Sequence, residues 1–473
     1  MIKLEHSKYL ESKSEVITAL IDSIEKEYSS VSVLGADSYG MKYQVSSYGV
    51  TAEPSMWSER GFVLRALQDG RVFEYSFNAI SKDTLEDTAE KILDDFKELG
   101  EVSQDPIEFQ DYTVPYSDID YQGSCELLPA DIAPSEILEK LTALHDSAKR
   151  SKEEIVNAKV VFEGLSVSKF FYTKKGTMKQ SYPWCQSAVF VIAKRGDVPR
   201  YSYKTFAGRK GPEILEEVGD AVSHIAAEAV ELLDAVSPEP GEYDVICNPG
   251  IAGTIAHESF GHGVELDMFL RGRAKAGKYF GKPVASGLVS ITDSPTAVDQ
   301  TGSYSFDDEG TPAGSTAIIE KGIFISGIGD MLSASALNMQ STGNGRRESY
   351  KRKAYSRMTN TFIEPGNDTL DEMIASVKKG YLIEGLRSGM EDPKNWGIQL
   401  IALLGKEIID GKLTGKLVTP VLLTGFVPDV LGAVSMVSDS AEFYGFGYCG
   451  KGYKELVKVS AGAPYIKTRM RIG

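Results

Sequence analysis

The apolar positions of the first hundred residues repeat at two spacings. In residues 7–29 and 84–98 they lie three or four positions apart, which predicts two amphipathic helices. Between them the segment RGFVLRALQDGRVFEYSFN alternates around Asp69 and Gly70, and this pair supplies the positive φ angles that a two-residue turn needs. A β-hairpin is therefore expected there. A less regular segment, about residues 100–133, is rich in Asp, Tyr and Pro. It separates this unit from the next.

The same two spacings return in the next block. Helical spacing runs from Ser135 to about Glu153 and precedes a strand-rich segment whose Lys-Lys-Gly turn, at 174–176, indicates an antiparallel meander. Residues 212–235 again have helical spacing. The linker that follows, at 237–240, places two prolines between that helix and the strand YDVICNP. It is the best domain boundary in the chain.

Helices and strands occur in blocks rather than in strict alternation, and this order favours an α+β fold. We expect an N-terminal α/β region with an antiparallel sheet over residues 1–236, divisible into sub-units 1–100 and 134–236. The remainder, 241–473, is expected to form a mostly β domain that carries a metal-binding helix.

Composition narrows the class of protein. A chain of 473 residues, 42% hydrophobic and 25% charged, is long enough for a large buried core. The net charge of −16 argues against nucleic-acid and anionic-membrane partners, which need concentrated basic surfaces. Because no apolar run reaches membrane-spanning length and the N-terminus is charged, we expect a cytoplasmic protein. The four cysteines are scattered without paired spacing, so no disulfide framework is expected.

The segment IAHESFGHGVELD, residues 255–267, carries the candidate chemistry. His257 and His262 are five positions apart, so an ideal α-helix would turn the second about 140° away from the first. A π-bulge would bring them together, and so would a helix that ends at Gly261 in the left-handed conformation. Glu258 stands beside the first histidine, as in zinc peptidase helices. The alternative is a helix with two partly buried histidines satisfied by hydrogen bonds.

A catalytic zinc generally takes three protein ligands, so a third ligand is required. Glu265 is close in sequence and could bind directly or orient His262 from behind. Cys449 is remote, but glycines surround it, and Lys451 nearby would favour the thiolate. The competing interpretation of Cys449 is a buried thiol that packs as a small hydrophobe.

Five motifs occur in a fixed order, HESFGHGVELD, FDDEGTP, STGNGRRESY, SRMTNTFIEPG and CGK. In this order they resemble the TldD/PmbA family of metallopeptidases, in its motif-bearing TldD-type branch. The resemblance implies that His257, His262 and Cys449 hold one divalent metal and that Glu258 is the general base. Zinc is the expected metal, and a nitrogen and sulfur ligand set also tolerates iron.

The resemblance also implies partners and a substrate. It implies an assembly that is either a homodimer or a heterodimer with a related TldE/PmbA-like subunit, and hydrolysis of unfolded or leader-type peptides inside an enclosed cavity. Two segments depart from the family pattern, CGKGYK after Cys449 and GMEDPKNWGIQLI in place of a Gly-rich stretch. The alternatives are a non-catalytic partner subunit or regulator, and a metal-dependent amide or ester hydrolase with a non-peptide substrate.

Three further groups are candidates near this site. Arg346, Arg347 and Tyr350 could contact substrate or an oxyanion, or else form an Asn-Gly turn with solvated arginines. Asp267, with Glu265, could support the metal ligands from a second layer. The acidic run 307–309 is expected to be a solvated turn rather than a second metal site, because no fourth oxygen ligand is recognisable at usable spacing.

Overall fold

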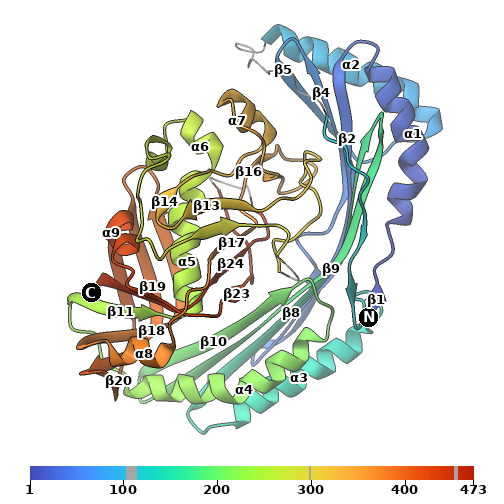
Figure 1. The fold of residues 1–473 in the computed structure, drawn as a ribbon. Helices are drawn as coiled ribbons and strands as arrows, with labels where there is room; N and C mark the ends of the chain where they lie inside the picture. The colour runs from blue at the N-terminus through green and yellow to red at the C-terminus, as the bar shows by residue number, and fades with distance from the viewer. Residues whose placement is uncertain (103–113, 298–299, 452–455) are drawn as a thin grey trace.

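The computed structural model describes residues 1–102, 114–297, 300–451 and 456–473, and its elements form two layers (Figure 1). The N-terminal layer is a long, curved sheet of eight strands in the order β10-β9-β8-β2-β4-β5, with β3 beside β2 and β6 beside β9. All neighbours are antiparallel except β6 and β9. The strands are β2 (Ser29–Ser46), β3 (Gly49–Pro54), β4 (Glu59–Gln68), β5 (Arg71–Phe77), β6 (Asp120–Gln122), β8 (Ile155–Thr173), β9 (Gly176–Arg195) and β10 (Val198–Gly208).

Helices cover the outer face of this sheet, in two pairs (Figure 1). One pair packs against β2 and β5, and the other against β8, β9 and β10. Each pair buries the apolar face that its spacing predicted, and the two resulting cores are separate. The helices are α1 (Lys8–Ile24), α2 (Leu85–Val102), α3 (Pro134–Arg150) and α4 (Ile214–Glu231), with short 3₁₀ turns at Lys82–Thr84 and Leu232–Asp234.

The sequence predictions for this layer are confirmed where the structure describes it. Asp69 and Gly70 have φ angles of 51° and 72° between β4 and β5, as the hairpin required. Strands β8 and β9 pair antiparallel around the turn that precedes Gly176. Residues 103–113, within the irregular segment, lie outside the described part of the chain.

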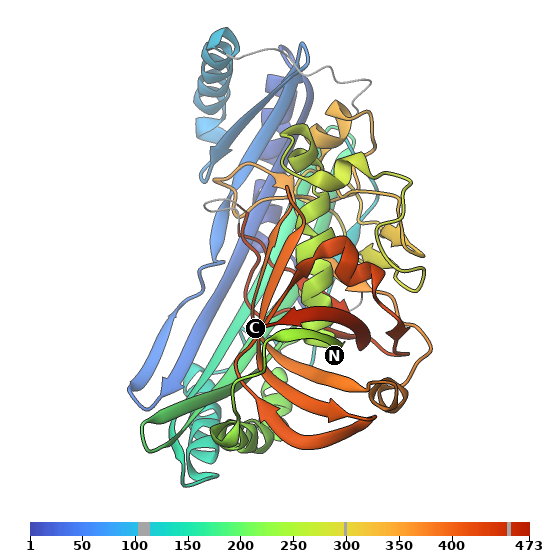
Figure 2. The ribbon, with the colours of Figure 1, turned by 90° about the vertical axis from the view of Figure 1, so that its left-hand side faces the viewer.

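The C-terminal layer lies on the inner side of the curved sheet (Figure 2). It contains a seven-stranded sheet, β11-β18-β19-β21-β25-β22 with β20 beside β19, and a six-stranded sheet, β14-β13-β12-β17-β24-β23. Its strands are β11 (Gly241–Cys247), β12 (Ile291–Asp293), β13 (Thr316–Glu320), β14 (Ile323–Phe324), β17 (Asn360–Ile363), β18 (Lys379–Asp392), β19 (Gly397–Ile409), β20 (Lys412–Val418), β21 (Val421–Phe426), β22 (Met436–Val437), β23 (Glu442–Tyr444), β24 (Ser460–Ala463) and β25 (Ile466–Ile472).

Short elements complete the described chain. Two small sheets pair β1 (Ile2–Lys3) with β7 (Ser124–Cys125) and β15 (Gly345–Arg346) with β16 (Tyr355–Ser356). The remaining helices are α6 (Leu266–Leu270), α7 (Met331–Ala336), α8 (Leu370–Ala375) and α9 (Val427–Gly432), with 3₁₀ turns at His262–Val264 and Lys275–Lys278. The mixed α and β composition and the β-rich C-terminal region confirm the predicted fold class. No helix in the described ranges is long and apolar enough to cross a bilayer.

Helix α5 (Pro249–Phe260) occupies the centre of the C-terminal layer (Figure 1). It packs against β18 of one sheet and β17 and β24 of the other, so nine of its twelve residues are buried. Asn248 caps its first turn, because the side-chain oxygen accepts a hydrogen bond from the Ile251 amide at 3.1 Å. The histidine motif is therefore fixed on a helix held from two sides.

Buried ion pairs join the two layers at the acidic run 307–309. Asp308 accepts a 2.5 Å hydrogen bond from Lys169 Nζ on β8, and Glu309 lies 2.7 Å from Arg65 on β4. Asp307, Asp308 and Glu309 are only 2%, 6% and 3% exposed. The expectation of a solvated turn is therefore wrong, because basic partners from distant strands cover Asp308 and Glu309, and backbone amides donate to Asp307.

Candidate metal centre

The end of α5 explains the spacing of five between the two histidines. The α-helix ends at Phe260, and the chain continues as a 3₁₀ turn over His262–Val264. The prediction that the helix ends at Gly261 is confirmed, but the left-handed conformation is wrong, since φ and ψ are −98° and −77°. A Cβ at Gly261 would lie 1.9 Å from Met358 Sδ and 2.3 Å from the His257 carbonyl oxygen. Close approach, rather than a positive φ angle, requires glycine here.

The tighter turn brings two imidazoles and a distant thiol together. One ligand atom each of His257, His262 and Cys449 lies within 4.8 Å of the others. Cys449 Sγ is 2.9 Å from His262 Nε2, and the two imidazole centroids are 5.2 Å apart. His257 Nδ1 is buried without a hydrogen-bond partner. Within the described ranges this is the one group of three such residues, and its nitrogen, nitrogen and sulfur donors fit a divalent ion such as zinc or iron.

Charge at the cluster favours a thiolate. Burial opposes ionisation, but the neighbouring imidazoles of His262 and His257 hold the pKa of the Cys449 thiol well below its ordinary value. In the same way, Cys449 and Glu265 raise the pKa of His262 against the effect of its burial. The thiolate is the form that binds metals, so the site is prepared for a cation.

Behind the cluster, a buried carboxylate holds one imidazole in place. Glu265 Oε2 lies 3.4 Å from His262 Nδ1 and 3.0 Å from Lys451 Nζ. Although burial favours the neutral acid, Lys451 and His262 lower the pKa of Glu265 to about 2. Lys451 also donates to Asp267 at 2.5 Å. Glu265 thus contacts His262 directly and Asp267 is linked to it through Lys451, while the role of both in support of a metal stays a prediction.

One residue of this arrangement was missed in the sequence. Arg357 is fully buried, and its Nη2 donates to the Cys449 carbonyl oxygen at 3.0 Å and to Cys449 Sγ at 3.2 Å. It also forms an ion pair with Glu265 at 3.3 Å. The SRMTNTFIEPG motif contains this arginine, but nothing in the motif links it to a cysteine 92 positions later.

Two pockets meet at the cluster. The acidic pocket, of about 460 Å3, is formed by α5, the end of β18 and the Cys449 loop. The interlayer pocket, of about 620 Å3, lies between the C-terminal layer and residues of β10 and α4, among them Tyr203, Thr205 and His224. The residues that line both pockets are His257, Glu258, Gly389, Tyr448 and Cys449. Glu258 therefore stands where the two pockets join.

An unpaired carboxyl group faces the acidic pocket. Both carboxylate oxygens of Glu391, at the end of β18, are buried without a hydrogen-bond partner. Burial raises the pKa of Glu391 to about 9, and Glu258 adds to this rise while His262 opposes it. Glu391 belongs to GMEDPKNWGIQLI, one of the two departures from the family pattern. The other departure, CGKGYK, extends into residues 452–454, outside the described part of the chain.

The three candidate oxyanion contacts lie elsewhere. Arg346 Nη1 donates to the Met358 carbonyl oxygen at 2.6 Å, and the buried guanidinium of Arg347 pairs with Glu74 of the N-terminal sheet. The Tyr350 amide donates to Glu59 at 2.8 Å. None of the three is among the described residues that line the acidic or the interlayer pocket.

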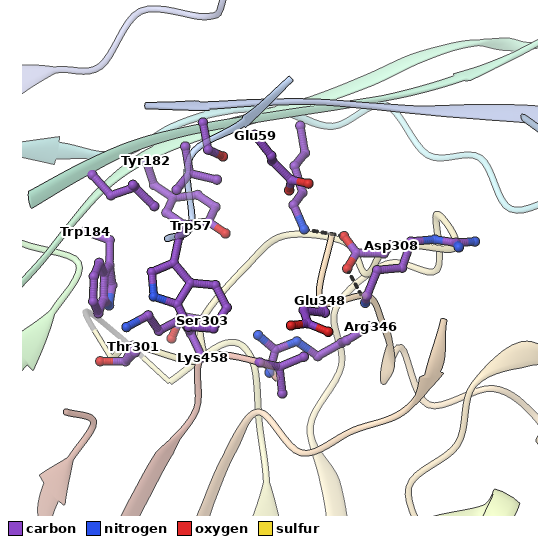
Figure 3. A pocket seen from close by; sticks show the side chains of 16 residues that line it. Trp57, Glu59, Tyr182, Trp184, Thr301, Ser303, Asp308, Arg346, Glu348 and Lys458 are labelled. Atoms are coloured by element: carbon purple, nitrogen blue, oxygen red, sulfur yellow. Dashed lines mark hydrogen bonds and ion pairs between the residues drawn. The ribbon is translucent and has the colours of Figure 1, made fainter. Parts of the chain in front are cut away.

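Arg346 and Arg347 instead line a third pocket between the two layers (Figure 3). There Arg346 and Asp308 lie across from Trp57 and Lys458 (Figure 3). Because Asn344 and Arg347 are buried and Arg347 pairs with Glu74 of the N-terminal sheet, the solvated Asn-Gly turn is wrong as well. An oxyanion role at the histidine and cysteine cluster does not fit these positions.

Sequence comparisons identify the family of the chain. The sequence model of the PmbA/TldA metallopeptidase C-terminal domain matches residues 240–473. A metalloprotease from Methanothermobacter thermautotrophicus is 30% identical over 345 residues, which cover 72% of this chain and 74% of the relative. A zinc metalloprotease TldD homolog from Saccharolobus solfataricus is 28% identical over 290 residues, 60% of this chain and 64% of the relative.

Solved structures share the fold over almost the whole chain. TldE from Thermococcus kodakarensis superposes with a TM-score of 0.77 at 18% identity, covering 97% of this chain and all of that chain. A Thermotoga maritima protein described as a putative modulator of a DNA gyrase superposes with a TM-score of 0.78 at 18% identity. The match covers 97% of this chain and 99% of that chain. At this identity the likeness establishes the fold, and family membership rests on the sequence matches. The chain is a member of the TldD/PmbA family of metallopeptidases.

Proposed function

We propose that this protein is a metal-dependent peptidase whose metal is held by His257, His262 and Cys449. The observation that carries the proposal is the convergence of three ligand atoms within 4.8 Å, with Glu258 on the same helix where two pockets join. Relatives named metalloprotease support a peptidase at the level of the family. Zinc is the proposed ion, supported by the donor set and by the name of one relative.

In this proposal each residue has a separate task. When bound, a divalent ion lowers the pKa of a coordinated water toward 7 and polarises a carbonyl group. Glu258, as general base, accepts the proton of the attacking water and passes it to the leaving amine. Arg357 stabilises the thiolate of Cys449, and Glu265, which lies beside Nδ1 of His262, orients the neutral imidazole that a metal requires.

The substrate proposed is an extended, unfolded segment of peptide. Pockets of about 460 and 620 Å3 that share Glu258 offer room on both sides of a scissile bond. A folded domain does not fit such spaces, whereas an extended chain can also gain backbone hydrogen bonds from strand edges. Varied sequences would then be cleaved with modest side-chain selectivity.

We further propose that the active assembly is at least a dimer, with a second copy or with a TldE-like chain. The likeness to TldE supports a partner of this fold. The β2–β3 hairpin also exposes apolar side chains, with Tyr48 92% and Val50 54% exposed, which are suited to an interface. Sedimentation of the purified protein, alone and with a TldE-like chain, tests this proposal. A fully active monomer would contradict it. The cytoplasmic location stays a prediction.

The test of function combines metal analysis with cleavage of an unstructured peptide. Purified protein should contain about one zinc per chain. Glu258→Gln should retain that zinc while cleavage falls by about 10²- to 10⁴-fold, since the general base is removed. Glu320→Gln, on the exposed side of β13, is the matched control and should cleave normally. Equal cleavage by both variants would reject Glu258 as the base, and peptide binding without cleavage by the wild type would favour a regulatory role.

A further inference from the structure

The acidic pocket has a feature that water activation does not use. Glu391 presents a carboxyl group with both oxygens buried and unpaired, on the pocket wall that also contains Glu258. A buried polar group without a partner costs free energy, more so when it is charged. Such a group in a binding pocket indicates a ligand that pairs with it.

The surroundings of Glu391 define the charge of that ligand. Glu258, Glu265 and Asp392 act on it with negative charge, and the imidazole of His262 opposes them. Among the described residues that line this pocket Lys451 is the one lysine, and it already pairs with Glu265 and Asp267, at 3.0 and 2.5 Å. The free position beside Glu391 therefore favours a cation and disfavours a carboxylate, such as the C-terminus of a peptide.

We infer that the acidic pocket is a subsite for a primary ammonium group of the peptide substrate, with Glu391 as the residue that pairs with it. The inference rests on the proposed peptidase function, and it adds a substrate class to that function. The ammonium group is either the free N-terminus of the peptide or a lysine side chain, and both present the same three donors to the carboxylate.

The geometry assigns Glu391 to binding rather than to the reaction. It is not among the three residues whose ligand atoms converge within 4.8 Å. It lies at the end of β18, where its oxygens are 3.4 and 3.9 Å from the position that a Cβ on Gly263 would take, just beyond His262. An ammonium group bound there would hold one end of a peptide next to Glu258 and the metal ligands.

The test compares peptides that differ only in the amine. In the first series, lysine-free peptides with a free N-terminus are compared with the same peptides acetylated at the N-terminus. In the second series all peptides are acetylated, and lysine is compared with norleucine at each position in turn. For the wild type, kcat/KM should be about 10- to 100-fold higher for the peptide with the matching ammonium group, the range expected of a hydrogen bond to a charged group. The first series identifies an N-terminal ammonium, and the second a side-chain ammonium.

Glu391→Gln should remove this preference, so that kcat/KM becomes the same for each pair of matched peptides with and without the ammonium group. Asp392→Asn is the matched control, because Asp392 is adjacent but exposed and accepts hydrogen bonds within its own turn. It should keep the preference. An equal preference in the wild type and Glu391→Gln, or no preference in either series, would overturn the subsite.

Binding separates the failure of this inference from failure of the proposed function. Calorimetry with zinc-loaded Glu258→Gln protein measures the Kd of the same peptides without turnover. If no peptide is ever cleaved but the amine still strengthens binding about 10-fold through Glu391, the peptidase proposal fails and the subsite stands. If peptides are cleaved and bound equally with and without the amine, the subsite fails and the peptidase proposal stands.

Discussion

Arg357 Nη2 lies 3.2 Å from Cys449 Sγ, and the same guanidinium pairs with Glu265, which in turn contacts His262. The fully buried guanidinium of Arg357 thus links the Cys449 thiol, through Glu265, to the imidazole of His262. This arrangement supports the ionised form of the thiol before any metal binds, because a cation beside a thiol stabilises its thiolate.

Arg357→Lys should weaken metal binding. Lysine keeps the charge but lacks the planar fork that reaches Cys449 and Glu265 together. Residues behind metal ligands typically contribute 10- to 100-fold in affinity, so the Kd for zinc should rise by about that factor. Competition with a chromogenic chelator measures it. The control is Arg352→Lys, whose side chain is 46% exposed, and an unchanged Kd in both variants would contradict the role of Arg357.

Zinc should stabilise the folded protein through Cys449. At a free zinc concentration 100-fold above Kd, the free energy of unfolding should rise by about 2.7 kcal/mol relative to chelator-treated protein. Thermal unfolding with and without zinc measures this gain, and Cys449→Ser should lose most of it. Cys125→Ser is the control, because Cys125 lies outside the cluster and donates a hydrogen bond to the Leu127 carbonyl that serine can replace. A full zinc effect in Cys449→Ser would exclude the cysteine as a ligand.

Gly389→Ala should reduce cleavage while zinc remains bound. A Cβ at this position of β18 would lie 2.6 Å from Thr254 Cγ2 and 3.3 Å from Glu258 Cγ, so these side chains of α5 must shift. Overpacking of this kind costs about 1–3 kcal/mol and displaces the proposed base. Gly397→Ala on the neighbouring β19 meets no atom within 4 Å and should behave as wild type. Matched kcat/KM values for the two variants would show that the close contact at Gly389 is unimportant.

Glu74 should make the junction of the two layers sensitive to acid. It lies between Arg65 and Arg347, and although burial opposes ionisation, these cations hold its pKa well below the ordinary value of 4.5. A carboxyl whose pKa is lowered by folding contributes stability above its unfolded pKa and loses it as pH falls toward the folded pKa. Glu74→Gln should therefore cost about 3–5 kcal/mol at pH 7, and the difference from wild type should shrink below about pH 4.5.

Denaturant unfolding of both proteins from pH 7 to pH 3 measures that difference. Glu53→Gln is the control, because its pair with Lys42 is exposed on both sides and should contribute little at any pH. A Glu74→Gln penalty that stays constant with pH would contradict the ion-pair explanation.

Local sequence patterns were sufficient for the elements of the N-terminal layer. The hairpin at Asp69 and Gly70 follows from two positive φ angles, which adjacent residues alone determine. The end of α5 at Gly261 was also predictable from local sequence, because the two histidines are five positions apart and Gly261 lies between them. The predicted left-handed conformation was wrong, and the side chain that excludes a Cβ at Gly261 belongs to Met358, nearly 100 positions away. The domain boundary at 237–240 stays a prediction.

Contacts between distant segments account for the other errors. The acidic run 307–309 looked solvated because Arg65 and Lys169, which cover it, come from the other layer. Arg347 looked free to bind an oxyanion for the same reason, since its partner Glu74 lies 273 positions earlier. Charge patterns in a single sequence show which groups need partners, but they do not show which partners the fold supplies.

The interlayer pocket has a consequence for how substrate preference can change in this lineage. Tyr203, Thr205 and His224 belong to the N-terminal layer, yet they form part of the wall beside Glu258. Substitutions at such positions can reshape the wall without altering His257, His262 or Cys449. Mutations in the first half of the gene can therefore change this wall while the codons of the three clustered residues, in the second half, stay the same.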